Sequence, residues 1–410
     1  NLIQDNFKIM NSMSMSAIEI KATLSLSAVF FLRMLPLFML LPVLSLTGDS
    51  YQASTPQLLG IALGIYGLTQ ASLQIPFGML SDRFGRKPII CLGLVIFIIG
   101  SLIAAMSDSI YGLILGRAIQ GAGAIAAAIM ALAADLSTEQ HRTKVMACIG
   151  ISIGISFSVA FVLGPFLYSH IGINGLFYLG VCMAILAIST LLIIVPSPIE
   201  DNKSDRGSIN FQSLKSVISN LYLLKLNISI FSSHLILMAN FVVIPLALRD
   251  FVQIEATSHW QVYLVVLFAS LFIMVPFMGF GERLKKTKLF YTTSIILIIF
   301  SQAGLAFFHL DLITLVLSMV LFFGGFNYLE ALLPSEVSKV TSVETKGTAL
   351  GVYSSFQFIG IFIGGMVGGF FHQQFGLISV HFFCLFIALL WLCTIIYIPY
   401  GKKGLGENLL

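Results

Sequence analysis

Charged residues are scarce in this sequence: Asp, Glu, Lys and Arg make up 10% of its 410 residues, against roughly a quarter in an ordinary soluble domain. Hydrophobic residues make up 58% and form long apolar runs of about twenty residues, which match the hydrocarbon thickness of a bilayer. These features exclude a soluble enzyme, a secreted disulfide scaffold and a disordered chain. They predict a protein that crosses a membrane many times.

Sequence signals for bond-making chemistry are also few. The five cysteines lie in apolar segments and form no C-x-x-C pair, so they predict neither a metal site nor a disulfide framework. We find no phosphate-binding loop for ATP and no nucleophile–base arrangement. The net charge of +4 does not form a nucleic-acid-binding pattern. We therefore expect no enzyme activity, no metal, no cofactor and no nucleic-acid partner.

Twelve apolar stretches are long enough to span a bilayer as helices, which satisfy their own backbone groups where no water is present. They cover residues 22–47, 56–81, 87–107, 110–134, 144–170, 173–195, 220–248, 258–281, 288–308, 312–335, 347–373 and 377–399. The expected fold class is an all-α membrane protein.

Basic residues are divided unevenly between the two sides of such a membrane. Nineteen of the 22 Lys and Arg residues fall on the side of both termini, and Arg249 alone falls in a loop on the other side. The positive-inside rule then places both termini in the cytoplasm, with the protein in a bacterial inner membrane.

A polar stretch that is amphipathic near its end divides the chain between the sixth and seventh spans. The predicted segments are a cytoplasmic tail, a six-helix bundle, a cytoplasmic linker, a second six-helix bundle and a second tail, at 1–21, 22–196, 197–219, 220–400 and 401–410. The loop from Pro76 resembles the loop from Pro276. Two parallel halves around a central site are a common plan of transporters, although two basic loops can also resemble each other by chance.

Two motifs resemble the major facilitator superfamily. G-M-L-S-D-R-F-G-R-K, from Gly78 to Lys87, is similar to that family's signature between helices two and three. R-A-I-Q-G-A-G-A, from Arg117 to Ala124, resembles a signature of its twelve-span drug:proton antiporter branch. The resemblance is strongest to YajR-like members, whose extra C-terminal soluble domain we expect this chain to lack. It implies two pseudo-symmetric six-helix halves in a protein that usually works as a monomer.

The first motif predicts a cytoplasmic gate. Asp82 lies four positions before Arg86, so the two can pair at the membrane edge, with Asp135 as a second acid. The resemblance implies that the cluster locks the two halves together, with Asp82 facing Gly347 at the start of helix eleven. The alternative is a set of solvated charges that only fixes topology. The predicted gate residues are Gly78, Asp82, Arg83, Gly85, Arg86, Asp135 and Gly347.

Small residues on the fifth and eleventh spans predict close helix packing. The predicted packing residues are Gly150, Gly154, Gly164, Pro165, Gly360 and Gly364. The antiporter signature has two further glycines where this sequence has Tyr168 and Ser169. That departure keeps a proton symporter or a uniporter open as alternatives.

Ionisable side chains recur inside the first, fourth, seventh and tenth spans. They are Arg33, Arg117, His234 and Glu330. A charge inside a membrane costs from about 3 to more than 10 kcal/mol, so it usually faces a cavity or a partner. The resemblance implies that these four spans line a central cavity, and we interpret the four residues as proton-coupling candidates.

Glu330 is the first candidate for a proton carrier, because low-dielectric surroundings let a carboxyl group exchange its proton near neutral pH. The alternative is a permanent ion pair with Arg33 or with a residue of another helix. His234 can switch near neutral pH or can be hydrogen-bonded structure, and Arg117 can relay protons or anchor its helix. Further polar residues that we expect in the cavity are Gln70, Gln74, Gln120, Asn240, Asn327, Tyr328 and Gln357.

The expected function is secondary active transport by alternating access. A proton gradient would drive a drug-like or amphiphilic small molecule out of the cell, with protons, substrate and lipid as the partners. The alternatives are a symporter or uniporter that imports a sugar or an organic acid and, from another class, a membrane receptor that does not transport.

Overall fold

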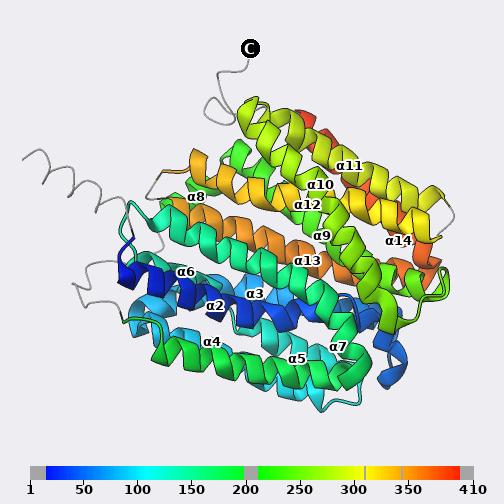
Figure 1. The fold of residues 1–410 in the computed structure, drawn as a ribbon, viewed down its shortest axis with the longest axis horizontal. Coiled ribbons are helices and arrows are strands. Elements are labelled where there is room, and N and C mark those ends of the chain that lie inside the picture. Colours follow the sequence, from blue (N-terminus) through cyan, green and yellow to red (C-terminus); the bar gives the residue numbers. More distant parts are fainter. Residues whose placement is uncertain (1–14, 198–210, 309–310, 343–344, 398–410) are drawn as a thin grey trace, which may run out of the picture.

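Long helices that lie side by side build the computed structural model (Figure 1). The residues that it describes are 15–197, 211–308, 311–342 and 345–397. They contain no β-strand, and an isolated bridge joins Gln52 to Ser109. The predicted tail at 401–410 and residues 198–210 of the predicted linker lie outside this description.

The N-terminal half contains α2, the 3-10 helix η1, α3, α4, α5, α6 and α7. Their bounds are Ala17–Met39, Leu44–Ser50, Pro56–Phe84, Arg86–Ala105, Ile110–Ala122, Ala126–Asp135 and Arg142–Ile193. The C-terminal half contains α9, η2, α10, α11, α12, α13 and α14. Their bounds are Leu221–Asp250, Ala256–Ser258, His259–Arg283, Thr287–Phe307, Leu312–Val340, Lys346–Phe375 and Leu377–Tyr397. The short α8, Phe211–Ile218, stands between them.

Within the described ranges, 11 helical segments are long and apolar enough to cross a membrane. One of them, Lys144–Ile193, has 50 residues and is broken at Gly172, where φ is 66°. Glycine adopts this left-handed conformation without steric cost. The parts of this segment before and after Gly172 are the predicted fifth and sixth spans. The 11 segments therefore provide twelve spans, and the twelve-helix fold is confirmed.

Some helix ends differ from the sequence prediction. The first helix begins at Ala17 rather than at residue 22, because Ser16 and Glu19 form a capping box that satisfies backbone N–H groups. It ends at Met39, and η1 replaces the last turns of the predicted span. The fourth span is split into α5 and α6.

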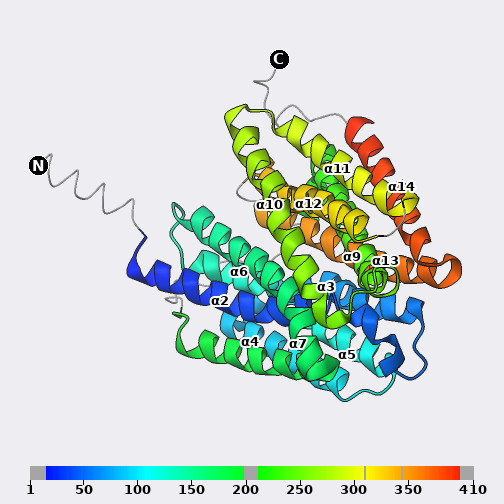
Figure 2. The same ribbon diagram turned by 45° about the vertical axis from the view of Figure 1, so that its right-hand side comes forward.

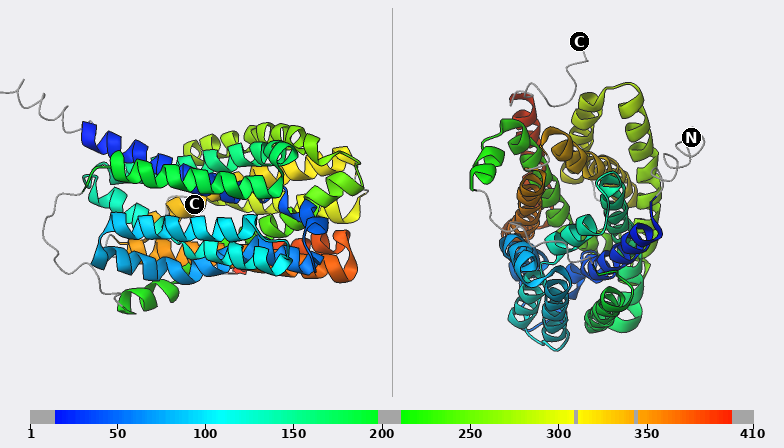
Figure 3. Two further views of the ribbon diagram at one scale, coloured as in Figure 1. Left: turned by 90° about the horizontal axis from the view of Figure 1, so that it is seen from below. Right: turned by 90° about the vertical axis from the view of Figure 1, so that its left-hand side faces the viewer.

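The two halves meet mainly along two pairs of helices, and α3 also contacts α9. The helix α3 packs on α13, and α7 packs on α10, while α8 contacts α9 and α13. Viewed along the helices, the halves form two groups (Figure 3, right), which are also separate in Figure 2. We call the end of the molecule with α8 and the start of α2 the linker end. The opposite end, where α2 leads into η1, is the distal end.

Candidate functional site

Three polar side chains from the C-terminal half meet near the middle of the molecule and form what we call the central polar cluster. Gln357 Nε2 donates to Glu330 Oε1 at 3.2 Å and lies 2.8 Å from His234 Nε2. His234 Nε2 is 3.7 Å from Glu330 Oε2. The three residues come from α12, α13 and α9, so separate helices position one cluster.

Hydrogen bonding fixes which nitrogen of His234 carries a hydrogen in the neutral ring. Nδ1 lies 3.1 Å from the carbonyl oxygen of Ile230, which can only accept. Nδ1 is therefore the protonated nitrogen, and Nε2 is left to accept from Gln357. His234 is 5% exposed, so this arrangement is shielded from solvent.

Glu330 is divided between two environments. Its side chain is 42% exposed, but its Oε2 atom is buried and has no hydrogen-bond partner among the described residues. A buried carboxylate oxygen without a donor is costly. Glu330 thus has a partly exposed side chain and one buried oxygen atom that receives no hydrogen bond from the described residues.

Arg33 does not pair with Glu330, so this predicted ion pair is wrong for the conformation described here. Arg33 Nη2 donates to the carbonyl oxygens of Gln120 at 3.0 Å and Gly123 at 3.3 Å, and the guanidinium lies 4.1 Å from the ring centroid of Phe97. These carbonyl groups lie where α5 ends inside the half. A cation there is stabilised by the helix dipole.

Arg117 is also directed into the N-terminal half. Its guanidinium donates to Gln120 Oε1 at 2.9 Å and to the carbonyl oxygens of Ala62 at 3.2 Å and Leu63 at 3.4 Å. Gln120 in turn donates to Ser101 at 2.8 Å. Arg117 therefore fastens α5 to α3. Gln120 lies inside this half rather than in the expected cavity, because it satisfies these buried groups.

The other expected cavity residues are dispersed. Gln70 and Gln74 on α3 are buried, and each Oε1 atom lacks a partner in the described part of the chain. Asn327 donates to Ser270 at 3.5 Å. Tyr328 packs edge-on against Phe277, with ring centroids 5.7 Å apart. Apart from Gln357, none of these residues joins a hydrogen bond of the central polar cluster in the contacts described.

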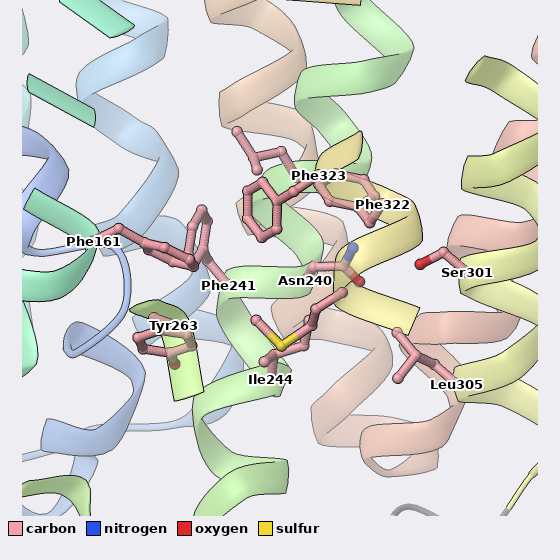
Figure 4. A pocket seen from close by; sticks show the side chains of 11 residues that line it. Phe161, Asn240, Phe241, Ile244, Tyr263, Ser301, Leu305, Phe322 and Phe323 are labelled. Atoms are coloured by element: carbon pink, nitrogen blue, oxygen red, sulfur yellow. The ribbon is translucent and has the colours of Figure 1, made fainter. Parts of the chain in front are cut away.

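Asn240 lies in a small pocket that has room for about one water molecule. The pocket is lined by Phe161, Leu237, Asn240, Phe241, Ile244, Tyr263, Ser301, Leu305, Met319, Phe322 and Phe323. Figure 4 shows the Asn240 amide between the aromatic rings and Ser301. Neither Oδ1 nor Nδ2 of Asn240 has a hydrogen-bond partner within the described ranges.

Aromatic rings on the distal side of the central polar cluster join the two halves. Phe161 from α7 stacks on Tyr263 at 4.3 Å between ring centroids and meets Phe241 edge-on at 5.5 Å and Phe323 at 5.1 Å. We call these four residues the aromatic seal. Since Phe323 precedes Glu330 by about two turns of α12, the seal lies between the cluster and the distal end.

The helices α3 and α13 touch through their backbones in the distal part of the molecule. A Cβ atom on Gly64 would lie 2.9 Å from the carbonyl oxygen of Phe362, and one on Gly369 would lie 2.6 Å from that of Pro56. The N–H group of Gln57 donates to Gln373 Oε1 at 3.2 Å. The distal end is therefore closed between the halves.

The linker end has the opposite character. The linker end includes Gly150 and Gly154 on α7, Gly279 on α10, and Gly347 and Gly351 on α13. A Cβ atom on any of these glycines would meet no described atom within 4 Å beyond the neighbouring backbone of its own helix. Each of these three helices also contacts the other half. The two halves are therefore apart at the linker end.

The other predicted packing glycines make contacts nearer the distal end. A Cβ on Gly164 would lie 2.5 Å from the Met39 carbonyl oxygen, within the N-terminal half. Gly360 and Gly364 pack against the backbone of α9 at Phe231 and Leu235. Pro165 lies inside α7 next to Gly164. These glycines pack within a half, whereas Gly150 and Gly154 do not pack in this conformation.

The predicted gate residues form an ion-pair cluster within the N-terminal half. Arg86 pairs with Asp82 and with Asp135 at 3.0 Å, and its Nη1 donates to Ser81 at 2.8 Å. Gly85, with φ of 97°, provides the turn between α3 and α4. The cluster thus connects α3, α4 and α6.

The remaining gate residues stand outside that cluster. The expected contact between Asp82 and Gly347 is absent in the described conformation, because no described atom of another helix lies within 4 Å of a Cβ on Gly347. The Arg83 guanidinium lies 5.3 Å from the ring centroid of Phe84. A Cβ on Gly78 would meet Ala127 of the same half at 3.5 Å.

Two buried polar groups escaped the sequence analysis. Glu19 Oε1 accepts hydrogen bonds of 2.8 Å from both the backbone and the hydroxyl of Thr138, and Glu19 Oε2 lies 3.2 Å from His141 Nδ1. The sequence signal was the S-x-x-E capping box that starts at Ser16. The second group surrounds Glu336, which falls just past the predicted tenth span.

Comparison with known proteins identifies the family. The family model of the major facilitator superfamily matches residues 26–338. The chain therefore belongs to the major facilitator superfamily. It is a membrane transporter, and neither an enzyme nor a receptor, so the receptor alternative is wrong.

Several individual proteins are similar to the chain. The inner membrane transport protein YajR of Escherichia coli is 44% identical over 93% of this chain and 84% of its own length. An uncharacterized transporter of Buchnera aphidicola from Schizaphis graminum is 37% identical over 93% of this chain and 98% of its own. The quinolone resistance protein NorA of Staphylococcus aureus is 24% identical over 76% of this chain and 80% of its own. These similarities support a multi-pass protein of the inner membrane.

Solved structures share the fold at low identity. A bacterial homolog of the human lysosomal transporter Spinster, in an inward-facing and occupied conformation, matches with a TM-score of 0.77 at 12% identity, over 96% of this chain and all of its own. A D-xylose–proton symporter matches with a TM-score of 0.74 at 15% identity, over 95% of this chain and 99% of its own.

Proposed function

We propose that this transporter is a proton-coupled antiporter that exports a drug-like or amphiphilic small molecule by alternating access. The observation that carries the proposal is the central polar cluster. It joins a carboxyl group, an imidazole and an amide in one hydrogen-bonded unit. The name of NorA, a quinolone resistance protein, supports a drug-like substrate.

The cluster supports two hydrogen-bond arrangements that differ by one proton. With Glu330 ionised, Gln357 donates to both Glu330 and His234. When Glu330 takes up a proton, its hydroxyl becomes a donor and can replace Gln357 at His234 Nε2. Because the three residues come from three helices, this exchange alters the contact of α13 with α9 and α12. A proton can thereby bias the packing of the half.

The different packing at the two ends supports alternation between an inward-open and an outward-open conformation. Because basic residues gather at the linker end, we place that end in the cytoplasm, so the conformation described opens inward. In the outward-open conformation the aromatic seal would separate, and the gate residues would meet the start of α13. We expect the protein to work as a monomer, with the proton gradient as its energy source and no cofactor.

Proteoliposomes with an internal pH dye test this proposal. We expect a cationic amphiphile to move protons opposite to its own flux. Glu330→Gln should abolish that proton movement and leave substrate counterflow, which needs no net proton transfer, near the wild-type rate. Glu255→Gln, an exposed loop change, is the matched control.

Three results would contradict the proposal. Proton movement in the same direction as the substrate would make the protein a symporter. Substrate flux without protons in the wild type would make it a uniporter. Unchanged coupling in Glu330→Gln would remove Glu330 as the carrier.

A further inference from the structure

A buried hydrogen bond joins the two halves next to the aromatic seal. The Ser45 hydroxyl donates to the carbonyl oxygen of Phe241 at 3.0 Å. Ser45 belongs to η1 of the N-terminal half, and Phe241 belongs to α9 of the C-terminal half. Ser45 is 4% exposed and Phe241 is 5% exposed. The bond therefore crosses the boundary between the halves at a place that is shielded from solvent.

The carbonyl group of Phe241 depends on a donor from outside its own helix. Pro245 lies four residues later inside α9. In a regular α-helix, the N–H group of residue 245 would donate to the carbonyl oxygen of Phe241, but proline has no N–H group. A buried carbonyl group without a donor is costly. Ser45 thus supplies, from the other half, the donor that Pro245 cannot provide.

The 3-10 helix η1 holds Ser45 in place for this bond. The Thr47 hydroxyl donates to the carbonyl oxygen of Leu44 at 2.7 Å, which ties the turn around Ser45. Both Leu44 and Thr47 are buried, and η1 packs against α3 and α9. The turn that replaces the end of the predicted first span therefore directs the Ser45 hydroxyl toward α9.

Phe241 contacts the N-terminal half through its ring as well as its backbone. Its ring meets that of Phe161 edge-on, with centroids 5.5 Å apart. Phe161 also lies four residues before a proline, Pro165 in α7. Both helices therefore lack a backbone hydrogen-bond donor at the seal, and such positions are where helices bend. The Ser45 bond holds α9 against the other half at one of these two positions.

We propose that Ser45 is a positioning residue for transport, whose hydroxyl holds the distal end closed by bonding the carbonyl group that Pro245 leaves without a helical donor. In the outward-open conformation, solvent reaches the seal, and a water molecule can donate to Phe241 in place of Ser45. Opening then leaves no carbonyl group buried without a donor. This inference rests on the alternating access of the proposed function and requires neither its proton coupling nor its substrate.

Ser45→Ala tests the proposal in the full-length protein. Spin labels on Asp108 and Glu255, which are exposed residues, would report the separation of the halves at the distal end, with the native cysteines replaced. We expect the ratio of long to short label distances to rise about tenfold, because the Phe241 carbonyl group then lacks a donor in the closed conformation. Ser294→Ala is the control, since it removes a buried hydroxyl that donates within α11, and it should leave the ratio unchanged.

Pro245→Ala supplies the second measurement. It restores an N–H group that can donate to the Phe241 carbonyl oxygen within α9. In this background, Ser45→Ala should change the ratio of label distances by less than about twofold, because the two substitutions act on the same carbonyl group. An equal shift in both backgrounds would show that Ser45 acts only through packing, and the proposal would be wrong.

The proposal would also be wrong if Ser45→Ala kept the wild-type ratio, as Ser294→Ala should. Either failure is distinct from failure of the proposed antiport. Antiport is measured as proton movement with substrate in proteoliposomes, whereas the label distances are measured without substrate or a proton gradient. A wild type that moves no protons would therefore overturn the antiport and leave the role of Ser45 to be decided by the labels.

Discussion

The distal and linker ends of the molecule use the same helices in different ways. At the distal end, α3 and α13 meet glycine to backbone, as at Gly64 and Phe362, and aromatic rings from both halves stack. At the linker end, a Cβ atom on Gly347 or Gly351 of the same α13 would meet no described atom within 4 Å beyond the neighbouring backbone of α13. In this conformation the two halves are therefore joined at the distal end.

The contacts that remain at the linker end lie within a half rather than between the halves. Arg86 links α3, α4 and α6, and Glu19 links the start of α2 to Thr138. These pairs hold the helices of the N-terminal half together while the C-terminal half is separated from it at the linker end. A cycle that closes the linker end can therefore exchange contacts between halves without unfolding either one.

The largest effect on this contrast should come from Phe161→Ala. Phe161 is 1% exposed and contacts three rings of the opposite half, so its removal should cost about 3 kcal/mol. Part of that cost destabilises the conformation in which the distal end is closed relative to the one in which it is open. We expect spin labels on Asp108 and Glu255, with the native cysteines replaced, to show an added longer distance.

Phe300→Ala is the control for that experiment, because Phe300 is 61% exposed and lies outside the seal. It should leave the label distance unchanged. An unchanged distance in Phe161→Ala as well would mean that the seal does not hold the distal end closed.

A smaller effect should follow from Gly365→Ala. A Cβ at Gly365 would press on the backbone of α3 at Gly60 and Gly64, and such overpacking costs about 1 to 3 kcal/mol. The same pair of labels should report a partial opening of the distal end, together with slower transport. Gly351→Ala on the same helix meets open space and is the matched control. Equal label distances in the two variants would show that the backbone contact does not set the conformation.

The sequence predicts the helices well because span length and apolar composition are local properties. The split of α5 from α6 was not predictable in this way, since no proline marks it and the carbonyl groups at the break are satisfied by Arg33 from another helix. The capping box at Ser16 was readable but lay in a polar segment assigned to the tail.

The site was predictable only in part, for a related reason. The sequence placed His234 and Glu330 in spans that the family resemblance puts around a cavity and gave Gln357 as an expected cavity residue, and the structure joins the three. It also placed Arg33 there, although that side chain points into its own half. The direction in which a side chain points from its helix depends on packing between helices. Which end of the molecule is open depends on two packings of similar energy that the same sequence supports.

The smallest effect on the conformation described should come from Asp82→Asn. The Asp82 side chain is 23% exposed, and a partly exposed ion pair contributes about 0.5 kcal/mol. Arg86 also keeps its pair with Asp135. We therefore expect near-normal expression and little change in the distance between labels on Glu139 and Lys285 at the linker end. Asp49→Asn, at the distal end, serves as the control.

Transport by Asp82→Asn should nevertheless be slower, because the predicted contact of Asp82 with the start of α13 belongs to the conformation in which the linker end is closed. Substrate flux in proteoliposomes measures this. A flux equal to that of the wild type and of Asp49→Asn would show that the Asp82–Arg86–Asp135 cluster only organises the N-terminal half. Slower flux with an unchanged resting distance would show that Asp82 acts in the conformation in which the linker end is closed. The distal contacts between the halves disfavour that conformation.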